Sequence, residues 1–538
     1  MLVRDSEAGR LGLLPVVTAA ESAARDAAAI ASGIPSRALM QRAGAAAAGE
    51  ISLRLSDRLS SGVLVLAGPG NNGGDAWVVA RALAATGVRV RVLEPVAAKS
   101  DDAVAERELA LPVVERVSPA TAEAEATWRG EQILVDGLLG TGSSGAPRGP
   151  IADALRALGT ARGAGAVIVA LDLPTGVDAT SGSSVGAVTA DLTLTFGTVK
   201  RGHLVARDAC GEIVVLDIGL GSHVEIGDGA PKLIDESWVS ANVPRIAADA
   251  HKGTRKKLAI VGGAAGMAGA TMLAARAAMA SGVGMVKLVV DEASLPVVQE
   301  SEPYALAAPW PDGPQAVTTG LADWADAVVI GPGLSRSART RALVECVLAQ
   351  WHGPVVLDAD ALNVFEGDTT ALARALRGEE RPALLTPHPA EFARLCGMSV
   401  ADVLAKRFEI GRELAGRVGA TVLLKGVPTV VSPRQGEALV SASGTPALAT
   451  AGSGDVLSGV AGTLLAQLGD AGVAGACAAW VHGRAAERAA GVSGMRATRV
   501  RGITLADVLT ALPLGWRLDA GPRRYPVLAE LPDVGEPA

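Results

Sequence analysis

The strongest constraint on the fold is a repeated alternation between short apolar runs and longer stretches whose apolar residues have helical spacing. Strands that are separated by helices pair in parallel and form sheets with both faces covered. We therefore expect an α/β protein, and 538 residues are too many for a single core. The runs that predict buried strands are residues 63–66, 132–135, 166–171, 192–196 and 213–216 in the first half, and 258–261, 285–290, 327–330, 355–357, 383–385 and 421–424 in the second.

Local signals place two of the helices and one exposed strand. Thr18 and Glu21 have the spacing of a capping box, which predicts a helix that ends near Gly33. A second helix is expected at residues 76–85, directly after a glycine-rich turn. Valine and arginine alternate at residues 88–92, which predicts a strand with one face in solvent.

The periodic pattern lapses between Gly219 and about Val243, where glycines and a proline interrupt it. We place a domain boundary there and expect one domain at residues 1–228 and another at residues 229–517. The remaining tail, residues 518–538, is rich in proline and charge, so we expect it to be frayed or draped over the surface.

Composition and charge narrow the range of functions. The net charge is −7 and the chain has no basic run, which argues against nucleic acid as a partner. The four cysteines lack CxxC spacing, so we expect neither a zinc site nor disulfides, and a cytoplasmic location fits. The start of the chain makes a poor signal peptide. Residues 258–275 carry no charge, but three glycines divide them into a strand, a turn and a helix start, so no membrane span is expected.

A glycine-rich turn with one acid lies where an apolar helix is expected to begin. It reads Gly452, Ser453, Gly454 and Asp455. Backbone N–H groups of such a turn, together with the helix N-terminus, can hold a phosphoryl group. Asp455 could then take the proton from the hydroxyl that receives it. The alternative is a flexible surface loop, although the apolar neighbours of this turn disfavour it.

A second crevice is expected at the carboxyl ends of the first-half strands. Asp136 and Asp172 each end a strand, and a turn at residues 68–75 follows another. This turn matches GxGxxG literally, but the motif alone is weak and neither turn has the lysine of a GxxxxGK[ST] loop. Each aspartate alone could be a helix cap. Together they indicate a binding site whose carboxylate and amide oxygens suit a hard cation rather than zinc.

Polar residues also follow the strands of the second half. His388 stands between two prolines after residues 383–385, and Lys425 follows residues 421–424. His388 could be a site residue or a structural one, and Lys425 a phosphate neighbour or a surface charge. Asp358 and Asp360 could cap the next helix through Asn363, or hold magnesium through water.

The chain contains an ordered set of motifs. They are residues 71–75, Asp136 with 140–142, 172–176, 251–253, Gly269 with Ala270, 331–334, 358–363, 386–391, 424–426 and 454–455. The turn at residues 452–455, which follows the strand end at Lys425 and Gly426, resembles the ribokinase-like superfamily, and the whole set resembles the bifunctional NAD(P)H-hydrate repair enzymes over about residues 15–515. Departures from the family pattern are Ala76 for a usual glycine, Thr175 for serine, Gln41 near a usual glutamate and Ser335 for glycine.

The resemblance implies a Rossmann-like three-layer α/β/α sandwich followed by a ribokinase-like α/β/α domain. It also implies a set of site residues for each domain. In the first, potassium would be held by Asn72, Asp136 and Thr175, and the hydrated nucleotide by Asn71, Asn72, Gly73, Gly74, Asp75, Gly140, Thr141, Gly142, Ser143, Ser144, Gly145, Ala146 and Asp172. In the second, the hydrate would be bound by Ala270, Gly333, His388 and Asp455, and the adenine nucleotide by Lys425, Gly426, Val427, Pro428, Thr429 and Gly454.

The function expected from this resemblance is repair of NADHX and NADPHX. The first domain would interconvert the R and S epimers with Asp172 as acid/base. The second would dehydrate the S epimer, with Asp455 as base, magnesium on the nucleotide, and ADP favoured over ATP as phosphoryl donor. We also expect a homo-oligomer. Two alternatives stay open at this point: a kinase of a small vitamin-like alcohol, and a nucleotide-binding protein with an inactive N-terminal domain.

Overall fold

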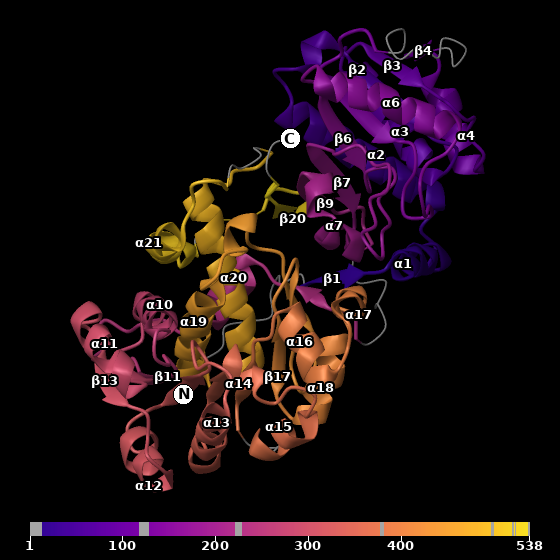
Figure 1. The fold of residues 1–538 in the computed structure, drawn as a ribbon. Helices are drawn as coiled ribbons and strands as arrows, with labels where there is room; N and C mark the ends of the chain where they lie inside the picture. Colours follow the sequence, from indigo (N-terminus) through magenta and orange to yellow (C-terminus); the bar gives the residue numbers. More distant parts are fainter. Residues whose placement is uncertain are drawn as a thin grey trace.

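The computed structural model describes residues 13–117, 128–220, 229–376, 381–495, 500–518, 521 and 523–535. Within them, the strands form two mostly parallel sheets, each flanked by helices (Figure 1). This confirms the expected α/β class. The first sheet has the order β20-β9-β7-β6-β5-β2-β3-β4. Its strands are β2 (Val63–Ala67), β3 (Val90–Leu93), β4 (Glu115–Val117), β5 (Ile133–Gly137), β6 (Val167–Leu171), β7 (Leu192–Phe196), β9 (Glu212–Leu216) and β20 (Val527–Leu531).

Helices cover both faces of this sheet. In β2, Val63 and Val65 belong to the hydrophobic cluster formed with α2 and α3, whereas Leu64 and Leu66 belong to the cluster formed with α6. Alternate residues of the strand therefore face opposite cores, which explains its unbroken apolar run. The helices of this half are α1 (Ala19–Ala31), α2 (Ser36–Arg54), α3 (Asn71–Ala85), α4 (Asp101–Ala110), α6 (Pro150–Gly163), α7 (Arg201–Val205) and α8 (Arg207–Cys210).

Strand β3 differs from the half-exposed strand that its alternation predicted, because its arginine is buried. Arg91 is 2% exposed, and its Nη1 donates a hydrogen bond of 2.7 Å to Glu131 Oε1. Glu131 is itself buried. An arginine that is paired with a buried carboxylate can occupy a core position, so alternation of polar and apolar residues did not mean exposure here.

The second sheet is parallel from β13 to β17, and the strands from β18 to β8 pair in a mixture of antiparallel and parallel directions. Its order is β13-β12-β11-β14-β15-β16-β17-β18-β19-β10-β1-β8. The strands not yet given are β1 (Leu14–Val17), β8 (Val199–Lys200), β10 (Lys232–Leu233), β11 (Lys257–Val261), β12 (Met285–Val290), β13 (Leu306–Pro309), β14 (Ala327–Ile330), β15 (Val355–Leu357), β16 (Ala383–Leu385), β17 (Thr421–Leu424), β18 (Thr429–Ser432) and β19 (Leu439–Ser441).

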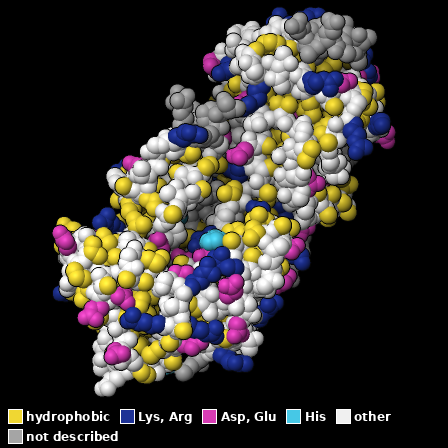
Figure 2. Space-filling model, in the orientation of Figure 1, with side chains coloured by type: hydrophobic (Ala, Val, Ile, Leu, Met, Phe, Trp, Pro, Cys, Tyr) yellow, Lys and Arg dark blue, Asp and Glu magenta, His cyan; other side chains and the backbone are white. Residues whose placement is uncertain are grey.

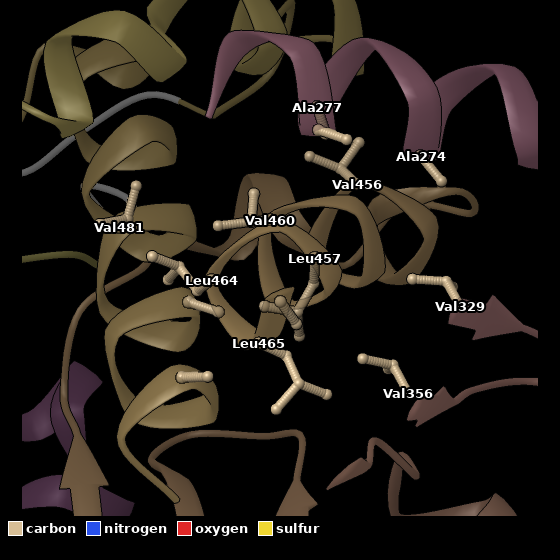
Figure 3. Packing of buried hydrophobic residues seen from close by; sticks show 14 of the residues in the cluster. Ala274, Ala277, Val329, Val356, Val456, Leu457, Val460, Leu464, Leu465 and Val481 are labelled. Atoms are coloured by element: carbon tan, nitrogen blue, oxygen red, sulfur yellow. The ribbon is translucent and has the colours of Figure 1, made fainter. Parts of the chain in front are cut away.

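Small residues let α19 (Ser453–Leu468), the central helix of the second half, pack closely against its neighbours. A Cβ on Gly462 would lie 2.4 Å from Val329 Cγ2, and one on Gly459 would lie 2.0 Å from Ala274 O. Figure 3 shows Val456, Val460 and Leu464 of this helix among the strand and helix side chains that surround it. The helices of this half are α9 (Glu236–Asn242), α10 (Ala268–Ala280), α11 (Leu295–Ser301), α12 (Pro314–Val317), α13 (Ala338–Gln350), α14 (Asp360–Asn363), α15 (Thr369–Leu376), α16 (Pro389–Cys396), α17 (Val400–Ala405), α18 (Ile410–Val418), α19 (Ser453–Leu468), α20 (Ala471–Ala490) and α21 (Leu505–Gly515).

The two ends of the chain each join the opposite half. Strand β1 pairs antiparallel with β10 and parallel with β8, so it lies between the second sheet and a strand of the first half. Strand β20 pairs antiparallel with β9 at the edge of the first sheet (Figure 1). The expectation of a frayed tail was therefore wrong for residues 527–531, which form a sheet edge with Val527 and Ala529 buried. The limits 1–228, 229–517 and 518–538 stay predictions.

No helix in the described part of the chain is long and apolar enough to cross a membrane. Residues 258–275, which carry no charge, divide into β11, a glycine-bearing turn and the start of α10. This is the division that the glycines of the sequence predicted.

Candidate active sites

The glycine-rich turn of the first half is the start of α3. The helix begins at Asn71, with Gly70 as its N-cap, five residues earlier than expected from the sequence. Glycine is required here because a Cβ on Gly73 would lie 1.8 Å from Gly68 O. A Cβ on Gly68 would in turn lie 1.7 Å from Leu138 O. The helix start is therefore held tightly against the loop that follows β5.

The three residues expected to hold potassium lie together. Thr175 donates from N and Oγ1 to the two carboxylate oxygens of Asp136, at 2.8 and 2.7 Å. Asn72 donates from Nδ2 to Leu139 O at 3.0 Å, while its Oδ1 is buried without a hydrogen-bond partner among the described residues. An orphaned amide oxygen beside a carboxylate, a hydroxyl and a carbonyl suits a hard cation, so these residues fit the ion.

Asp172 lies beside this cluster and is held by a buried lysine that sequence reasoning missed. The residue has φ 62°, and its Oδ1 accepts from Lys200 Nζ and from Thr195 Oγ1. Burial is the largest single effect and opposes ionisation, but the charge of Lys200 and the hydrogen bonds from Lys200 and Thr195 together lower the pKa of Asp172. Lys200 follows β7 by a few residues, so the rule that strand ends carry site residues could have found it.

A neutral histidine completes this arrangement. His203 accepts at Nδ1 from Lys200 N at 3.1 Å, and its Nε2–H donates to the carbonyl oxygen of Asp172 at 2.7 Å. Burial lowers the pKa of His203 to about 4, with Lys200 acting in the same direction. His203 therefore positions the backbone of Asp172 without carrying charge. No local pattern in the sequence marked it.

A second acid of this crevice, Asp75, has a pKa that is shifted in the opposite direction from that of Asp172. Desolvation raises the pKa of Asp75 well above its usual value, and the charges of Asp172 and Asp26 act in the same direction. Asp26, on α1, was not predicted as a neighbour, and partial desolvation raises its pKa as well. The crevice thus combines Asp172, whose pKa is lowered, with Asp75, whose pKa is raised, and two acids whose pKa values are pushed apart suit acid and base catalysis.

The glycine loop after β5 forms the rim of this crevice. A Cβ on Gly140 would lie 3.3 Å from Asn72 Cγ and 3.6 Å from Asp172 Oδ2, so Gly140 lies between the two. The remaining predicted residues, from Thr141 to Ala146, are half-buried or exposed. The methyl of Ala76 does not enter the crevice: it is fully buried, and a Cβ on Gly137 would lie 2.5 Å from it.

The second site is built on the first turn of α19. Gly452 is its N-cap with φ 92°, and Asp455 is the third residue of the helix. A Cβ on Gly454 would lie 3.1 Å from Lys425 Nζ, so the absent side chain leaves room for the ammonium at the helix start. An anion placed here would meet free backbone N–H groups, the helix dipole and a lysine.

Burial, together with the surrounding charges, places the pKa of Asp455 near neutral pH. Lys425 Nζ is 2.8 Å from Asp358 Oδ1 and 3.6 Å from Glu391 Oε2, and Ser458 donates to Asp358 Oδ2. Burial raises the pKa of Asp455 to about 7, and the charge of Asp358 adds to this against the opposing effect of Lys425. A carboxylate with this pKa can accept a proton under physiological conditions.

The alternative roles of His388 and Asp360 can now be assigned. His388 is the N-cap of α16 and accepts at Nδ1 from Ala390 N at 3.1 Å, yet its side chain is 46% exposed beside the cavity. It therefore acts as a cap and as a site neighbour. Asp360 accepts from Asn363 Nδ2 at 3.1 Å, whereas Asp358 is buried against Lys425.

A cavity of about 930 Å³ joins most of the second-half residues. Figure 2 shows a hollow between the two halves with charged side chains and a histidine at its edge. His482, which the sequence did not mark, also lines the cavity, and burial lowers its pKa to about 4. A Cβ on Gly333 would lie 3.1 Å from Ala270 Cβ, so these two residues are neighbours, but neither of them lines this cavity. The predicted residues that do line it are His388, Lys425, Gly426, Val427, Pro428, Thr429, Gly454 and Asp455.

Known proteins resemble the chain along both halves. Two family models match it, "YjeF-related protein N-terminus" at residues 36–202 and "NAD(P)H-hydrate dehydratase" at residues 258–504. The chain is 34% identical over 522 residues to the bifunctional NAD(P)H-hydrate repair enzyme of Moorella thermoacetica, covering 93% of this chain and 96% of that protein. It is 35% identical over 454 residues to the enzyme of the same name from Escherichia coli, covering 81% and 82%. Among solved structures, the ADP/ATP-dependent NAD(P)H-hydrate dehydratase of Bacillus subtilis has 28% identity and a TM-score of 0.46, covering 55% of this chain and all of that one.

Proposed function

The chain belongs to the family of bifunctional NAD(P)H-hydrate repair enzymes, and from this premise we propose how its two sites divide the work. It epimerises R- and S-NAD(P)HX and dehydrates the S epimer to NAD(P)H. The observation that carries the assignment is the presence of two separate acid–lysine sites, one within each matched family region. The first has its acid ionised, and the second has an acid poised near pH 7 at a helix N-terminus.

In the first half, the reaction is departure and return of a ring hydroxyl. Asp75, whose raised pKa favours the protonated form, gives its proton to the departing hydroxyl, and Asp172, whose lowered pKa favours the carboxylate, takes one from the returning water. Lys200 keeps Asp172 ionised. Asn72, Asp136 and Thr175 would hold a potassium ion, whose positive charge would offset the phosphates of the substrate.

In the second half, Asp455 takes the proton of the hydroxyl of S-NAD(P)HX while that oxygen forms a bond to the phosphoryl group of the nucleotide. The N–H groups at the start of α19 and Lys425 hold the transferred phosphoryl. Phosphate then leaves with the former hydroxyl oxygen, a ring proton is lost, and the double bond re-forms. Among the described residues, no group of three or more His, Cys, Asp or Glu is arranged to hold a metal, so we propose that Mg²⁺ arrives on the nucleotide.

Several finer points belong to the same proposal. ADP is the favoured phosphoryl donor, with ATP as the alternative. Lys425, Gly426, Val427, Pro428, Thr429 and Gly454 bind that nucleotide, and Ala270, Gly333, His388 and Asp455 contact the hydrate. The protein acts in the cytoplasm as a homo-oligomer on NADHX and NADPHX, without nucleic-acid or membrane partners.

The test is incubation of the protein with mixed-epimer hydrate and either ADP or ATP. We expect complete recovery of reduced-nicotinamide absorbance together with release of one phosphate per molecule repaired. A stable phosphorylated product instead of free phosphate would identify a kinase. Conversion that stops once the S epimer is consumed, beyond slow spontaneous exchange, would show that the first half is inactive as an epimerase.

A further inference from the structure

The cavity that contains Asp455 is closed on one side by the other half of the chain. We call this side the interdomain wall. It consists of Gly182, Ser184, residues 205–209 and, from the segment after β20, Val534. The same cavity is lined across from it by residues that follow β17 and by the start of α19. A ligand that filled the cavity would therefore touch both halves.

The interdomain wall is a fixed part of the first half. Asp178 Oδ1 accepts from Thr180 N at 3.0 Å and from Ser181 N at 2.7 Å, which fixes the loop before Gly182. A Cβ on Gly182 would lie 2.5 Å from Val205 Cβ, so this loop packs directly on α7. Short segments connect the wall to Asp172 on one side and to Lys200 and His203 on the other.

The wall carries a buried cation with unused hydrogen-bond donors. Arg207 is 4% exposed and donates from Nη2 to Pro532 O, but its Nε and Nη1 have no partner among the described residues. Glu487, Asp533 and Asp208 act on it through space, yet in the described part of the chain none forms an ion pair with it. The Glu487 oxygens already accept from Gly444 N and Arg484. A buried guanidinium without a paired anion is costly.

A second unsatisfied group lines the same cavity from the other half. His482, on α20, is 5% exposed, and its Nε2 is buried without a partner among the described residues. At about 930 Å³, the cavity is at the upper end of the ~300–1,000 Å³ usual for small-molecule sites. Arg207 and His482 thus both line a cavity large enough for a nucleotide, and each has at least one buried side-chain nitrogen without a hydrogen-bond partner among the described residues.

We propose that the first half forms part of the nucleotide site of the dehydratase, with Arg207 binding a phosphate group of a bound nucleotide. The inference rests on the proposed dehydration at Asp455. The phosphate belongs either to the adenine nucleotide that donates the phosphoryl group or to the dinucleotide hydrate. Both present the same chemistry to a guanidinium, which binds phosphate oxygens through two parallel N–H groups.

The experiment uses the full chain with two variants of the wall. Arg207→Gln removes the charge, and we expect it to raise one KM of the dehydration about tenfold or more, as loss of a hydrogen bond to a charged group does. A raised KM for ADP assigns the phosphate to the donor, and a raised KM for the hydrate assigns it to the substrate. Ser184→Trp fills the exposed rim of the wall and should raise the same KM. The matched control is Val185→Trp, because Val185 is 59% exposed on the same loop but does not line the cavity.

Calorimetric titration with ADP and with the hydrate separates this inference from the proposed function, since it needs no turnover. Weakened binding of one ligand by both wall variants, but not by Val185→Trp, supports the composite site. Unchanged affinities and unchanged KM values in both wall variants overturn it, even where the wild type dehydrates normally. If Arg207→Gln lowers the thermal stability so far that binding cannot be measured, the difference between Ser184→Trp and Val185→Trp decides.

Discussion

The two halves place an acid and a lysine at the ends of their strands, but the lysines have different partners. In the first half, Lys200 pairs directly with Asp172, and the pKa of that acid falls. In the second, Lys425 is 2.8 Å from Asp358, and Asp455 is left among like charges with a pKa raised by burial to about 7. Burial disfavours the ionised form of both acids. Direct contact with Lys200 helps to lower the pKa of Asp172, whereas Lys425, which is paired with Asp358, does not offset the effect of burial on Asp455.

The largest expected effect tests the second half. Asp455→Asn removes the proposed base, so we expect dehydration to fall by about 10²–10⁴-fold, the usual contribution of general base catalysis. Epimer exchange should persist, because the first site is untouched. Absorbance recovery and exchange measured on one preparation check this. Asp360→Asn is the matched control, since Asp360 is near Asp455 but does not line the cavity. If the Asp455→Asn variant still dehydrated the substrate at the wild-type rate, Asp455 would not be the general base.

The converse effect tests the first half. Asp172→Asn should slow epimer exchange by about 10²–10⁴-fold and leave dehydration of pure S epimer unchanged. The variant also leaves Lys200 buried without its carboxylate, so its folding must be verified by circular dichroism. Loss of both activities in a folded protein would contradict the separation of the two sites.

The pH profiles should move in opposite directions when the charge next to each acid is removed. Lys200→Met removes the cation that lowers the pKa of Asp172, so the acidic limb of epimer exchange should move to higher pH by about one unit. Asp358→Asn removes a like charge beside Asp455 and frees Lys425 to face it. The acidic limb of dehydration, expected near pH 7 in the wild type, should then move to lower pH.

These profiles are measured as kcat against pH for each reaction. Lys200→Arg serves as the conservative variant. Because it retains the positive charge, the acidic limb of its epimer-exchange profile should lie at the wild-type pH. If both limbs moved in the same direction, the contrast between the two lysines would be wrong.

The smallest expected effect concerns stability. An acid with a raised pKa destabilises the fold when it is ionised above that pKa, so Asp455→Asn should raise Tm at pH 8 by about 2 °C or more. Asp172 has a lowered pKa, so its contribution is present above the unfolded-state pKa and is lost as pH falls through the folded-state value. Asp172→Asn should therefore lower Tm at the same pH. Thermal melts of both variants check the signs.

Much of the fold could be predicted because strands and their ends have local signals. The apolar run at residues 63–66 became β2, and the acids placed after strands, Asp136 and Asp172, lie at one crevice. Lys425 and Asp455 were likewise brought together, although their roles remain proposals. These inferences needed only the rule that ligands bind at the carboxyl ends of parallel strands.

The features that could not be predicted from the sequence depend on contacts between segments that are far apart along the chain, and no local pattern encodes such contacts. Arg91 occupies a position in an alternating pattern that is typical of a surface residue. It is nevertheless buried, because its side chain pairs with Glu131, 40 positions later in the chain. Asp26 and His482 lie on helices without any motif, and Arg207 gains its meaning only because the two halves meet there. Strand β20 contains a glutamate and follows a proline-rich segment, so its pairing with β9 was not visible in the sequence.

The place of β20 has a consequence for how the protein is made. Strand β9 ends at Leu216, but β20, the strand that covers its edge, begins only at Val527 and is therefore synthesised after the strands of the second sheet. During synthesis of the whole second half, the first sheet therefore exposes unpaired N–H and C=O groups along β9. The first sheet cannot be completed before β20 has been synthesised. A chain stopped at residue 228 would therefore keep an open edge along β9 that is prone to association with other chains.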